Sequence, residues 1–434
     1  MNPARRRLLV LTYYYPPQPG SGSSRWAAMA EHLRGAGHEV TVLTAAPPGQ
    51  PQGVDGDVVR TGNLNSSPLL RRLLLRGGRS AANTSDGAQS SAAGSLPPLL
   101  WKGIVPDPWL LTWNPYALRA ARRLLRERRY DCLITSSPAH STHLVALALG
   151  ARSRPAWLAD FRDGWSFEPL LPPFPTPPQR TLDHWLERRV ATRADAVVAV
   201  TRPITEDFGG RFGVAAEHVA NGWDPDLLGR LPTAPAVGKA DPGRLTLLHT
   251  GALSGAWGRN PRALLAALRQ LIAQQPRAAE RIELLLAGEL SDEDRRLLGE
   301  YADLGDVLRP LGRLEREQAL ALQREADVLI LITSRNRGEA TGKLYEYMAA
   351  GRPVLALAAD NEAARIVRET NLGRAVAPDD AEAVLEGLED ALAGTLQATY
   401  APQGTERYSY PPLAERMAAI VETAIERRAA RRGS

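Results

Sequence analysis

The segment from Val328 to Leu357 constrains the fold more than any other part of the sequence. It begins with an apolar, β-branched run that has the length of a buried strand, expected over 328–333. A polar loop follows, and then a short helix is predicted over 342–350, with Gly351 as its C-terminal cap. A second buried strand is expected over 354–357. In a parallel α/β sheet, the loop and helix start of such a unit lie at the carboxyl edge, where ligands bind.

Two charged residues of this helix have a spacing that suggests a nucleotide site. Lys343 and Glu346 are three positions apart, so they share one helix face. Lys343 falls in the first turn, where free N–H groups and the helix dipole favour an anion, so a cation there is explained by an anionic ligand. Glu346 could then accept hydrogen bonds from a ribose. An exposed ion pair on a surface helix explains the same spacing equally well.

The run GKLYEYMAAGRPVLAL, residues 342–357, resembles the nucleotide-sugar signature of glycosyltransferase family four. That resemblance implies an α/β GT-B fold, in which two Rossmann-like domains with parallel sheets face an interdomain cleft. Glu346 matches the ribose-binding glutamate of the family. Six residues separate it from Glu339, one fewer than the family has between its two glutamates, so Gly338 holds the place of the first. We predict that a small adjustment of the loop lets Glu339 take the catalytic role of that first glutamate.

Length, composition and charge limit the class of protein to which the chain can belong. A chain of 434 residues is too long for one ordinary core, and a single cysteine, Cys132, rules out an internal disulfide. The apolar run near the N-terminus is short and ends in Pro16-Pro17, which is not typical of a signal peptide or a spanning helix. We therefore expect a cytoplasmic protein. The net charge of +5 favours an anionic partner, although no nucleic-acid-binding motif is present.

The N-terminal half begins with a predicted strand over 7–15 and a glycine-containing turn that opens a helix ending near Gly35. Such a turn lets a ligand approach the backbone closely. An NAD site is disfavoured, because the third glycine of the fingerprint and the ribose-binding acid after the second strand are both missing. The resemblance instead implies that Gly20 and Gly22 lie near the donor sugar. A loop that merely connects two elements is the alternative.

Two further polar segments follow predicted strands in this half. They are SSPAHSTH, residues 136–143, and DFRDGW, residues 160–165, and both are similar to segments of the family. The resemblance implies a catalytic role for Asp160 and acceptor binding by Arg162, Asp163 and His143. Arg162 and an aspartate could instead form a structural ion pair, and His143 could be a capping or packing residue.

The C-terminal half repeats the strand–loop–helix pattern. A strand is predicted over 245–249, and the loop after it contains Gly251 and Arg259. The resemblance places a basic residue here on the donor diphosphate, so Arg259 and Lys343 together would neutralise its charge. Backbone amides near Thr341 and Gly342 would complete the diphosphate site. The loop that contains Arg313 is similar to the one with which the family holds the base.

These patterns predict the domain organisation. We expect an N-terminal acceptor domain over 1–231, a linker over 232–243 that is rich in Pro, Ala and Gly, and a nucleotide-sugar domain over 244–410. A last helix over about 412–427, within 411–434, is expected to pack back on the first domain. A short, basic, leucine-rich helix is expected over 67–76, and it either lies on an anionic membrane, as a peripheral contact, or packs against its own domain.

The sequence therefore predicts a retaining, metal-independent glycosyltransferase. The donor substrate would be a nucleotide-diphosphate sugar, with no separate cofactor, and the acceptor would be a sugar or a lipid-linked sugar in cell-surface polysaccharide or glycolipid biosynthesis. Two alternatives remain. One is another GT-B enzyme, a nucleotide-sugar epimerase or a pseudo-glycosyltransferase. The other is an inactive protein that binds a nucleotide sugar without turnover.

Overall fold

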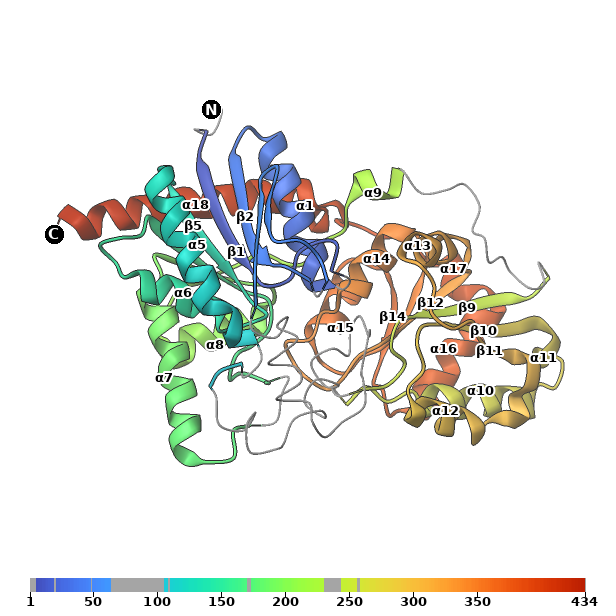
Figure 1. Cartoon of the computed structure of the whole chain (residues 1–434). Helices are drawn as coiled ribbons and strands as arrows, with labels where there is room; N and C mark the ends of the chain where they lie inside the picture. Colours follow the sequence, from blue (N-terminus) through green and yellow to red (C-terminus); the bar gives the residue numbers. More distant parts are fainter. Residues whose placement is uncertain are drawn as a thin grey trace. The chain divides into compact units, whose positions relative to one another are not determined.

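The computed structural model describes residues 5–18, 21–47, 49–63, 105–107, 110–169, 173–229, 243–255 and 258–433. The chain forms two compact units (Figure 1). The first consists of Met1–Ala220 together with Tyr410–Ser434, and the second of Asn221–Ser409. The final stretch of the chain therefore returns to the unit in which the chain began.

The described part of the first unit has an eight-stranded sheet in the order β3-β4-β2-β1-β5-β6-β7-β8. Neighbouring strands pair in parallel except β3 and β4. The chain builds outward in opposite directions from β1 and β5, which is the topology of a doubly wound sheet with a switch point between these two strands. The strands are β1 (Arg7–Thr12), β2 (Glu39–Ala45), β3 (Gly53–Asp55), β4 (Val58–Thr61), β5 (Cys132–Ser136), β6 (Ala156–Phe161), β7 (Ala196–Ala199) and β8 (Ala216–His218).

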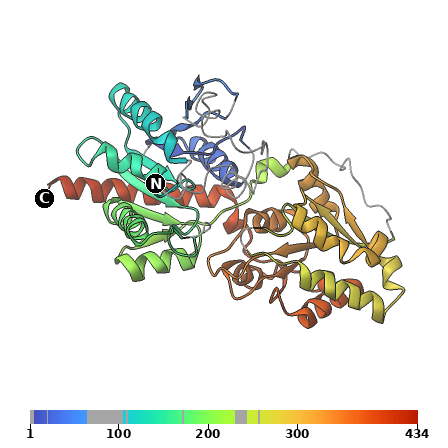
Figure 2. The ribbon, with the colours of Figure 1, turned by 60° about the horizontal axis from the view of Figure 1, so that its bottom comes forward.

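Helices cover both faces of this sheet, so its central strands are apolar and buried on both sides. On one face α1 (Ser21–Gly35) packs against α18 (Tyr410–Gly433), which runs along the sheet (Figures 1 and 2). On the other face four helices lie in a row from α5 to α8. They are α5 (Asn114–Glu127), preceded by a 3-10 turn over Leu110–Trp113, α6 (Thr142–Leu149), α7 (Pro177–Arg193) and α8 (Arg202–Phe212).

Charged side chains hold α18 on the first unit. Glu422 accepts hydrogen bonds from Arg6, just before β1, at 2.6 and 2.7 Å. Near its C-terminal end, Arg431 donates to the Asp195 carboxylate at 3.1 Å. Asp195 is fully buried and also accepts from Arg154 and from the backbone N–H of Trp157, both at 2.9 Å. One buried carboxylate therefore links β6, the start of β7 and the returning helix.

The described part of the second unit has a six-stranded parallel sheet in the order β11-β10-β9-β12-β13-β14. Its switch point lies between β9 and β12, where the chain again builds outward in both directions. The strands are β9 (Leu245–Thr250), β10 (Ile282–Ala287), β11 (Leu308–Pro310), β12 (Val328–Ile332), β13 (Val354–Leu357) and β14 (Gly373–Val376).

The helices of the second unit enclose a leucine-rich core on this sheet. The predicted helix over 342–350 is present as α14 (Gly342–Ala350), and Gly351 caps it in the left-handed conformation with φ 70°. The others are α9 (Pro225–Gly229), α10 (Arg262–Gln274), α11 (Ala278–Arg281), α12 (Asp292–Gly299), α13 (Arg316–Glu325), α15 (Glu362–Glu369), α16 (Ala381–Ala393) and α17 (Thr395–Ala398), with 3-10 turns over Ala302–Val307 and Glu406–Tyr408.

The structure differs from the sequence predictions in several places. We expected the first domain to extend to residue 231, but the first unit ends at Ala220, because Trp223 pairs with the end of the second unit: its N–H donates to the Tyr408 carbonyl at 3.0 Å. The last helix begins at Tyr410 and extends to Gly433, beyond the predicted limit of 427. The sequence patterns did not indicate α7 or the hairpin of β3 and β4. Residues 232–242 of the expected linker, and all of 67–79, lie outside the described residues.

Within the described residues, a search for an α-helix with the length and hydropathy needed to span a bilayer finds none.

The Asp195 cluster leads to a stability prediction. Asp195→Ala would leave the Arg154 guanidinium, only 4% exposed, without its carboxylate, and we expect a loss of about 3–5 kcal/mol in the free energy of unfolding. Urea denaturation followed by circular dichroism measures this loss. Glu127→Ala is the control, because it removes an exposed ion pair with Arg123 and should cost less than about 1 kcal/mol. Equal effects of the two variants would contradict the structural role of Asp195.

Candidate functional site

The loop after β9 meets the start of α14 at the switch point of the second unit. Gly251 adopts φ 87° and its N–H donates to the Ala287 carbonyl at 2.7 Å. A Cβ atom at Gly251 would lie 2.6 Å from Nζ of Lys343, and one at Gly288 would overlap the Gly251 carbonyl. Only glycine therefore permits this close approach. The structure thus brings the loop that contains Gly251 to Lys343.

The start of α14 has the groups that bind an anion. Thr341 is the N-cap residue, but its side chain makes no capping hydrogen bond, and its buried hydroxyl has no partner among the described residues. The N–H groups of the first turn, which begins at Gly342, carry the positive end of the helix dipole, and the Leu344 N–H donates to the Thr341 carbonyl at 3.1 Å. Lys343 adds a full positive charge beside them. Backbone and side chain thus combine into one positive site.

Glu346 lies one turn further along α14, on the same helix face as Lys343. Its carboxylate is 3.5 Å from Nη2 of Arg316, at the start of α13, and its side chain is 32% exposed. Glu346 is therefore accessible to a ligand and is held by a weak, solvent-screened ion pair. Arg313, on the loop before α13, is exposed. Its loop connects the end of β11 to the start of α13.

Glu339 has a different role from the one predicted. One of its oxygens accepts from Nη2 and Nε of Arg259 at 3.0 and 3.2 Å. The other accepts from the backbone N–H of Ser334 at 2.6 Å and from the Ser334 hydroxyl. Both side chains of the ion pair are almost buried. Glu339 thus holds Arg259 against the loop after β12, and this positions a cation rather than offering a free carboxylate to a sugar.

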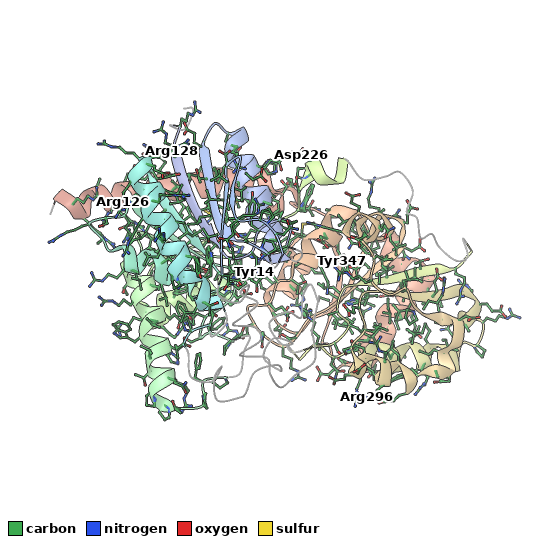
Figure 3. The ribbon with its side chains drawn as sticks, in the orientation of Figure 1. Tyr14, Arg126, Arg128, Asp226, Arg296 and Tyr347 are labelled. Carbon is green, nitrogen blue, oxygen red and sulfur yellow. The ribbon has the colours of Figure 1, made fainter. Side chains whose placement is uncertain are left out.

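Two buried residues that the sequence interpretation missed support the loop after β9. The hydroxyl of Tyr347, on α14, accepts from the Thr250 N–H at 3.0 Å (Tyr347 is labelled in Figure 3). Burial raises the pKa of Tyr347 to about 12, so it remains neutral. His249 contacts the carbonyl oxygens of Ile330 and Ala252 at 2.9 and 3.0 Å. Both residues lie in apolar stretches of the sequence, where a single polar residue gives little functional signal.

The structure contradicts the prediction that Asp160 is catalytic. Its side chain is fully buried at the end of β6 in the first unit. One oxygen is 3.2 Å from Nη2 of Arg25, and the other accepts from Nε1 of Trp26 at 2.9 Å and from the Ser136 hydroxyl at 2.8 Å. With both oxygens bound by protein groups, Asp160 joins α1 to the sheet. The partners come from distant parts of the sequence, which is why the pattern could not reveal them.

The predicted acceptor residues Arg162 and Asp163 lie near the switch point of the first unit. Arg162 donates to the Gly22 carbonyl at 2.8 Å, so it connects the end of β6 to the start of α1. Burial lowers the pKa of Arg162, while burial raises the pKa of Asp163 against the opposing effect of the Arg162 charge. Gly22 therefore contacts the DFRDGW segment, and Gly20 lies outside the described residues.

His143 is a core residue in this structure, which contradicts a direct contact with an acceptor. It is fully buried, its Nδ1 lies 2.8 Å from the Thr135 hydroxyl, and its ring centroid is 4.5 Å from that of Phe161. Burial lowers the pKa of His143 well below its usual value, so the ring is neutral. His143 is therefore a packing residue, which was the alternative role in the sequence analysis, because α6 directs this side chain into the sheet.

A neighbouring histidine is less deeply buried than His143. His140, in the same polar segment, is half-buried and stacks on Trp165 with ring centroids 5.0 Å apart. Trp165 donates to the Asp183 carboxylate at 2.8 Å, and burial raises the pKa of Asp183 to about 6. The sequence analysis named His143 and not His140 of SSPAHSTH, and it missed Asp183 because α7 was not predicted.

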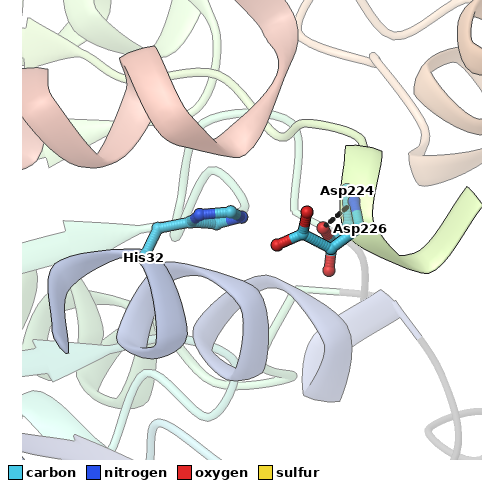
Figure 4. A group of neighbouring side chains, drawn as sticks. All are labelled: His32, Asp224 and Asp226. Atoms are coloured by element: carbon cyan, nitrogen blue, oxygen red, sulfur yellow. Dashed lines mark hydrogen bonds between the residues drawn. The ribbon is translucent and has the colours of Figure 1, made fainter. Parts of the chain in front are cut away.

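The Asp224-Pro225-Asp226 turn has the spacing of a metal-binding pair. Figure 4 shows that the Asp224 carboxylate accepts a hydrogen bond from the Asp226 N–H, at 3.0 Å. This bond stabilises the turn before α9, which explains the residue types at this position.

Two doubly wound α/β units, the second with a cluster of positive groups at its switch point, define a protein of the GT-B class. Residues 20–222 match the family described as "Glycosyl transferase 4-like domain", and residues 244–393 match "Glycosyl transferases group 1". The chain therefore belongs to glycosyltransferase family four.

The chain is also similar to individual proteins in sequence or in fold. The chain is 27% identical over 433 residues to a phosphatidyl-myo-inositol mannosyltransferase of Mycolicibacterium smegmatis, covering 93% of this chain and 90% of the relative. Its fold is similar to that of sucrose-phosphate synthase from Thermosynechococcus elongatus, with TM-score 0.58, 19% identity and coverage of 98% and 94% of the two chains. It is also similar to a trehalose-6-phosphate protein from E. coli bound with UDP-2-fluoro glucose, with TM-score 0.59, 14% identity and coverage of 98% and 97%.

The contact between Gly251 and Lys343 can be tested by adding one methyl group. Gly251→Ala should displace Lys343 and strain the loop, and we expect it to weaken binding of UDP or GDP by about 10-fold or more. Isothermal titration calorimetry measures this affinity. Gly210→Ala is the control, because that position lies in α8 with no neighbour near an added Cβ, and binding should not change. An unaltered affinity in Gly251→Ala would remove this loop from the site.

Proposed function

We propose that this glycosyltransferase moves a sugar, with retention of configuration, from a nucleotide-diphosphate sugar to an acceptor hydroxyl. One observation carries the proposal: Gly251, Lys343, Arg259 and the open N-terminus of α14 lie around a single switch point of the second unit. This arrangement combines backbone access, two cations and a helix dipole, which is the chemistry that a diphosphate requires.

The same groups favour departure of the diphosphate. Negative charge on the leaving group increases as the bond to the sugar breaks, so cations fixed in advance stabilise the transition state more than the ground state. Lys343 is held beside Gly251, and Glu339 fixes Arg259 by two hydrogen bonds. In this proposal Glu339 acts through Arg259, while Arg259 and Lys343 contact the donor. The positive charge for catalysis then comes from the chain itself.

Glu346 is proposed to bind the ribose. It can accept two hydroxyl hydrogen bonds in place of its long contact with Arg316. The family membership of the chain and the match of residues 342–357 to the family signature support this role. The E. coli protein of similar fold was bound with UDP-2-fluoro glucose, which supports a nucleotide-sugar donor for this chain.

The first unit is proposed to bind the acceptor. Asp163, with its raised pKa, and the His140–Trp165 stack are the polar and aromatic groups near its switch point. An aromatic face beside hydrogen-bonding groups suits a sugar ring. The name of the mannosyltransferase relative includes a phosphatidylinositol, which supports a sugar or lipid-linked acceptor in cell-surface polysaccharide or glycolipid synthesis.

Calorimetry and a transfer assay test the donor site. We expect UDP-, GDP- or dTDP-sugars to bind the wild type, and Glu346→Ala to weaken that binding by about 10- to 100-fold because it loses charge-assisted hydrogen bonds to the ribose. Glu339→Ala should reduce turnover more than affinity, because it releases Arg259 from its transition-state position. An unchanged affinity in Glu346→Ala would contradict the site. Tight binding without sugar transfer to any acceptor would instead identify an inactive nucleotide-sugar-binding protein.

We also propose that the first unit attaches peripherally to an anionic membrane, as its basic face suggests. The outer side of α5 and the residues after it carry exposed arginines, of which Arg126 and Arg128 are labelled in Figure 3. On α7, Leu182 and Trp185 are 46% and 51% exposed, and Arg189 stacks on the Trp185 ring at 5.2 Å. Arginine beside exposed tryptophan and leucine is typical of an interfacial surface.

Cosedimentation with phosphatidylglycerol vesicles tests this surface. Arg122→Glu/Arg126→Glu and Leu182→Ser/Trp185→Ser should each lower the bound fraction, because they remove attraction to anionic lipid and apolar insertion respectively. Arg295→Glu/Arg296→Glu reverses the same number of exposed charges in the second unit and should leave binding unchanged. Equal losses in the two charge-reversal variants would indicate only a net-charge effect. Deletion of residues 67–79 tests the other predicted membrane segment.

A further inference from the structure

His249 lies directly beneath the proposed donor loop and has an unusual environment. It is fully buried near the end of β9, two residues before Gly251. Its Nδ1 lies 2.9 Å from the Ile330 carbonyl oxygen on β12, and its Nε2 lies 3.0 Å from the Ala252 carbonyl oxygen in the loop. The ring therefore spans the two strands of the switch point and connects the donor loop to the sheet.

Both partners of the His249 ring are hydrogen-bond acceptors, so the protonation state of the ring decides how many hydrogen bonds it makes. A carbonyl oxygen only accepts, so the two contacts are both hydrogen bonds only when both ring nitrogens carry a proton. A neutral imidazole carries one proton, and its other nitrogen then directs a lone pair at a carbonyl oxygen. The geometry of both contacts thus suits the imidazolium form.

The surroundings of His249 oppose that form in the absence of a ligand. Burial, the Lys343 charge and, to a smaller extent, the Arg259 charge lower the pKa of His249 to about 4, although the two carbonyl groups act in the opposite direction. At neutral pH the ring therefore has one proton, and one of its two contacts is not a hydrogen bond. The donor loop is held by fewer bonds than its geometry allows.

We propose that His249 is a positioning residue for the donor loop, which takes up one proton when a diphosphate neutralises Lys343 and then donates to both Ile330 and Ala252. This inference rests on the proposed function, because it needs an anion at Lys343. The proton comes from solvent and no covalent bond changes. Ala252 is thereby fixed next to Gly251, so the ligand orders the loop that holds it.

Of the groups around His249, Lys343 is the one whose charge we propose that the diphosphate neutralises. Tyr347, on α14, contacts the same Ile330 carbonyl at 3.4 Å but is neutral, because burial raises its pKa to about 12. On α13, Gln323 donates to the Thr250 hydroxyl at 3.1 Å and carries no charge. Arg259 already has the Glu339 carboxylate at 3.0 Å. Among the described residues, the cation with the largest effect on His249 is Lys343.

The sign of the pH dependence follows directly. The pKa of His249 is higher with the diphosphate bound than without it, so binding consumes a proton. Affinity for the nucleotide sugar should therefore fall as pH rises through the bound-state pKa, and it should level off below the free-state value of about 4. A structural residue with no proton exchange would produce no such slope.

The first experiment requires no ligand. The full chain is labelled with 13C-histidine, and the His249 signal is assigned by its loss in His249→Gln and followed by NMR between about pH 3.5 and 7, a range that contains the expected midpoints. Lys343→Met removes the opposing charge at similar volume and should raise the midpoint of the His249 titration by about one pH unit relative to the wild type. An unchanged His249 titration in folded Lys343→Met would overturn the coupling.

The second experiment counts protons during binding. UDP-glucose and GDP-mannose are titrated calorimetrically near pH 6, in two buffers with different ionisation enthalpies; their diphosphate diesters do not titrate there, so exchanged protons belong to the protein. The wild type should take up a fraction of a proton, and His249→Gln, which retains one donor, should take up none. His38→Gln, far from this loop on the sequence and between α1 and β2, should behave as wild type.

The outcomes separate the two hypotheses. Binding by the wild type without proton uptake, or equal uptake in His249→Gln, would overturn the role of His249 while leaving the proposed donor site intact. A raised His249 midpoint in Lys343→Met would support the electrostatic coupling. If the wild type at the same time bound no nucleotide sugar, the proposed function would be contradicted.

Discussion

The close approach of Lys343 to Gly251 is the contact on which the candidate site depends. A lysine in the first turn of a helix is repelled by the helix dipole, so its position there needs another explanation. The absence of a side chain at Gly251 makes room for it, and the close packing of Gly288 beneath that loop requires a second glycine. The parallel order of β9 and β12 brings both segments together from distant parts of the sequence. Topology thus creates a positive site that neither segment has alone.

The two units share the doubly wound topology but differ in how deeply several of their ion pairs are buried. In the first, carboxylates such as Asp160 and Asp195 are buried and satisfied by arginine and tryptophan, so they stabilise the sheet. In the second, the pair of Arg316 and Glu346 beside the switch point is partly exposed, and a ligand could replace Arg316 as the partner of Glu346. Burial explains this contrast, because removing a partner from a buried charge costs far more than exchanging a half-exposed one.

The sequence predicted those features that local pattern determines. The helix over 342–350, its Gly351 cap and the flanking strands follow from periodicity and capping within a few residues, and the structure matches them. The roles of Asp160 and His143 were wrong because burial and partners depend on α1, α6 and the sheet, which no local motif encodes. His140 and Asp183 were missed for the same reason: their common neighbour, Trp165, brings together residues of two separate segments.

The charges around the donor site connect its ligand to His249. Arg259 and Glu339 neutralise each other, as do Arg316 and Glu346, so this set has the net charge of Lys343 alone. The helix N-terminus adds roughly half a charge, whereas a diphosphate diester brings two negative charges. In our proposal the occupied site is therefore left slightly negative, and a proton on His249 offsets this charge. Two carbonyl oxygens are already placed to accept hydrogen bonds from the charged ring.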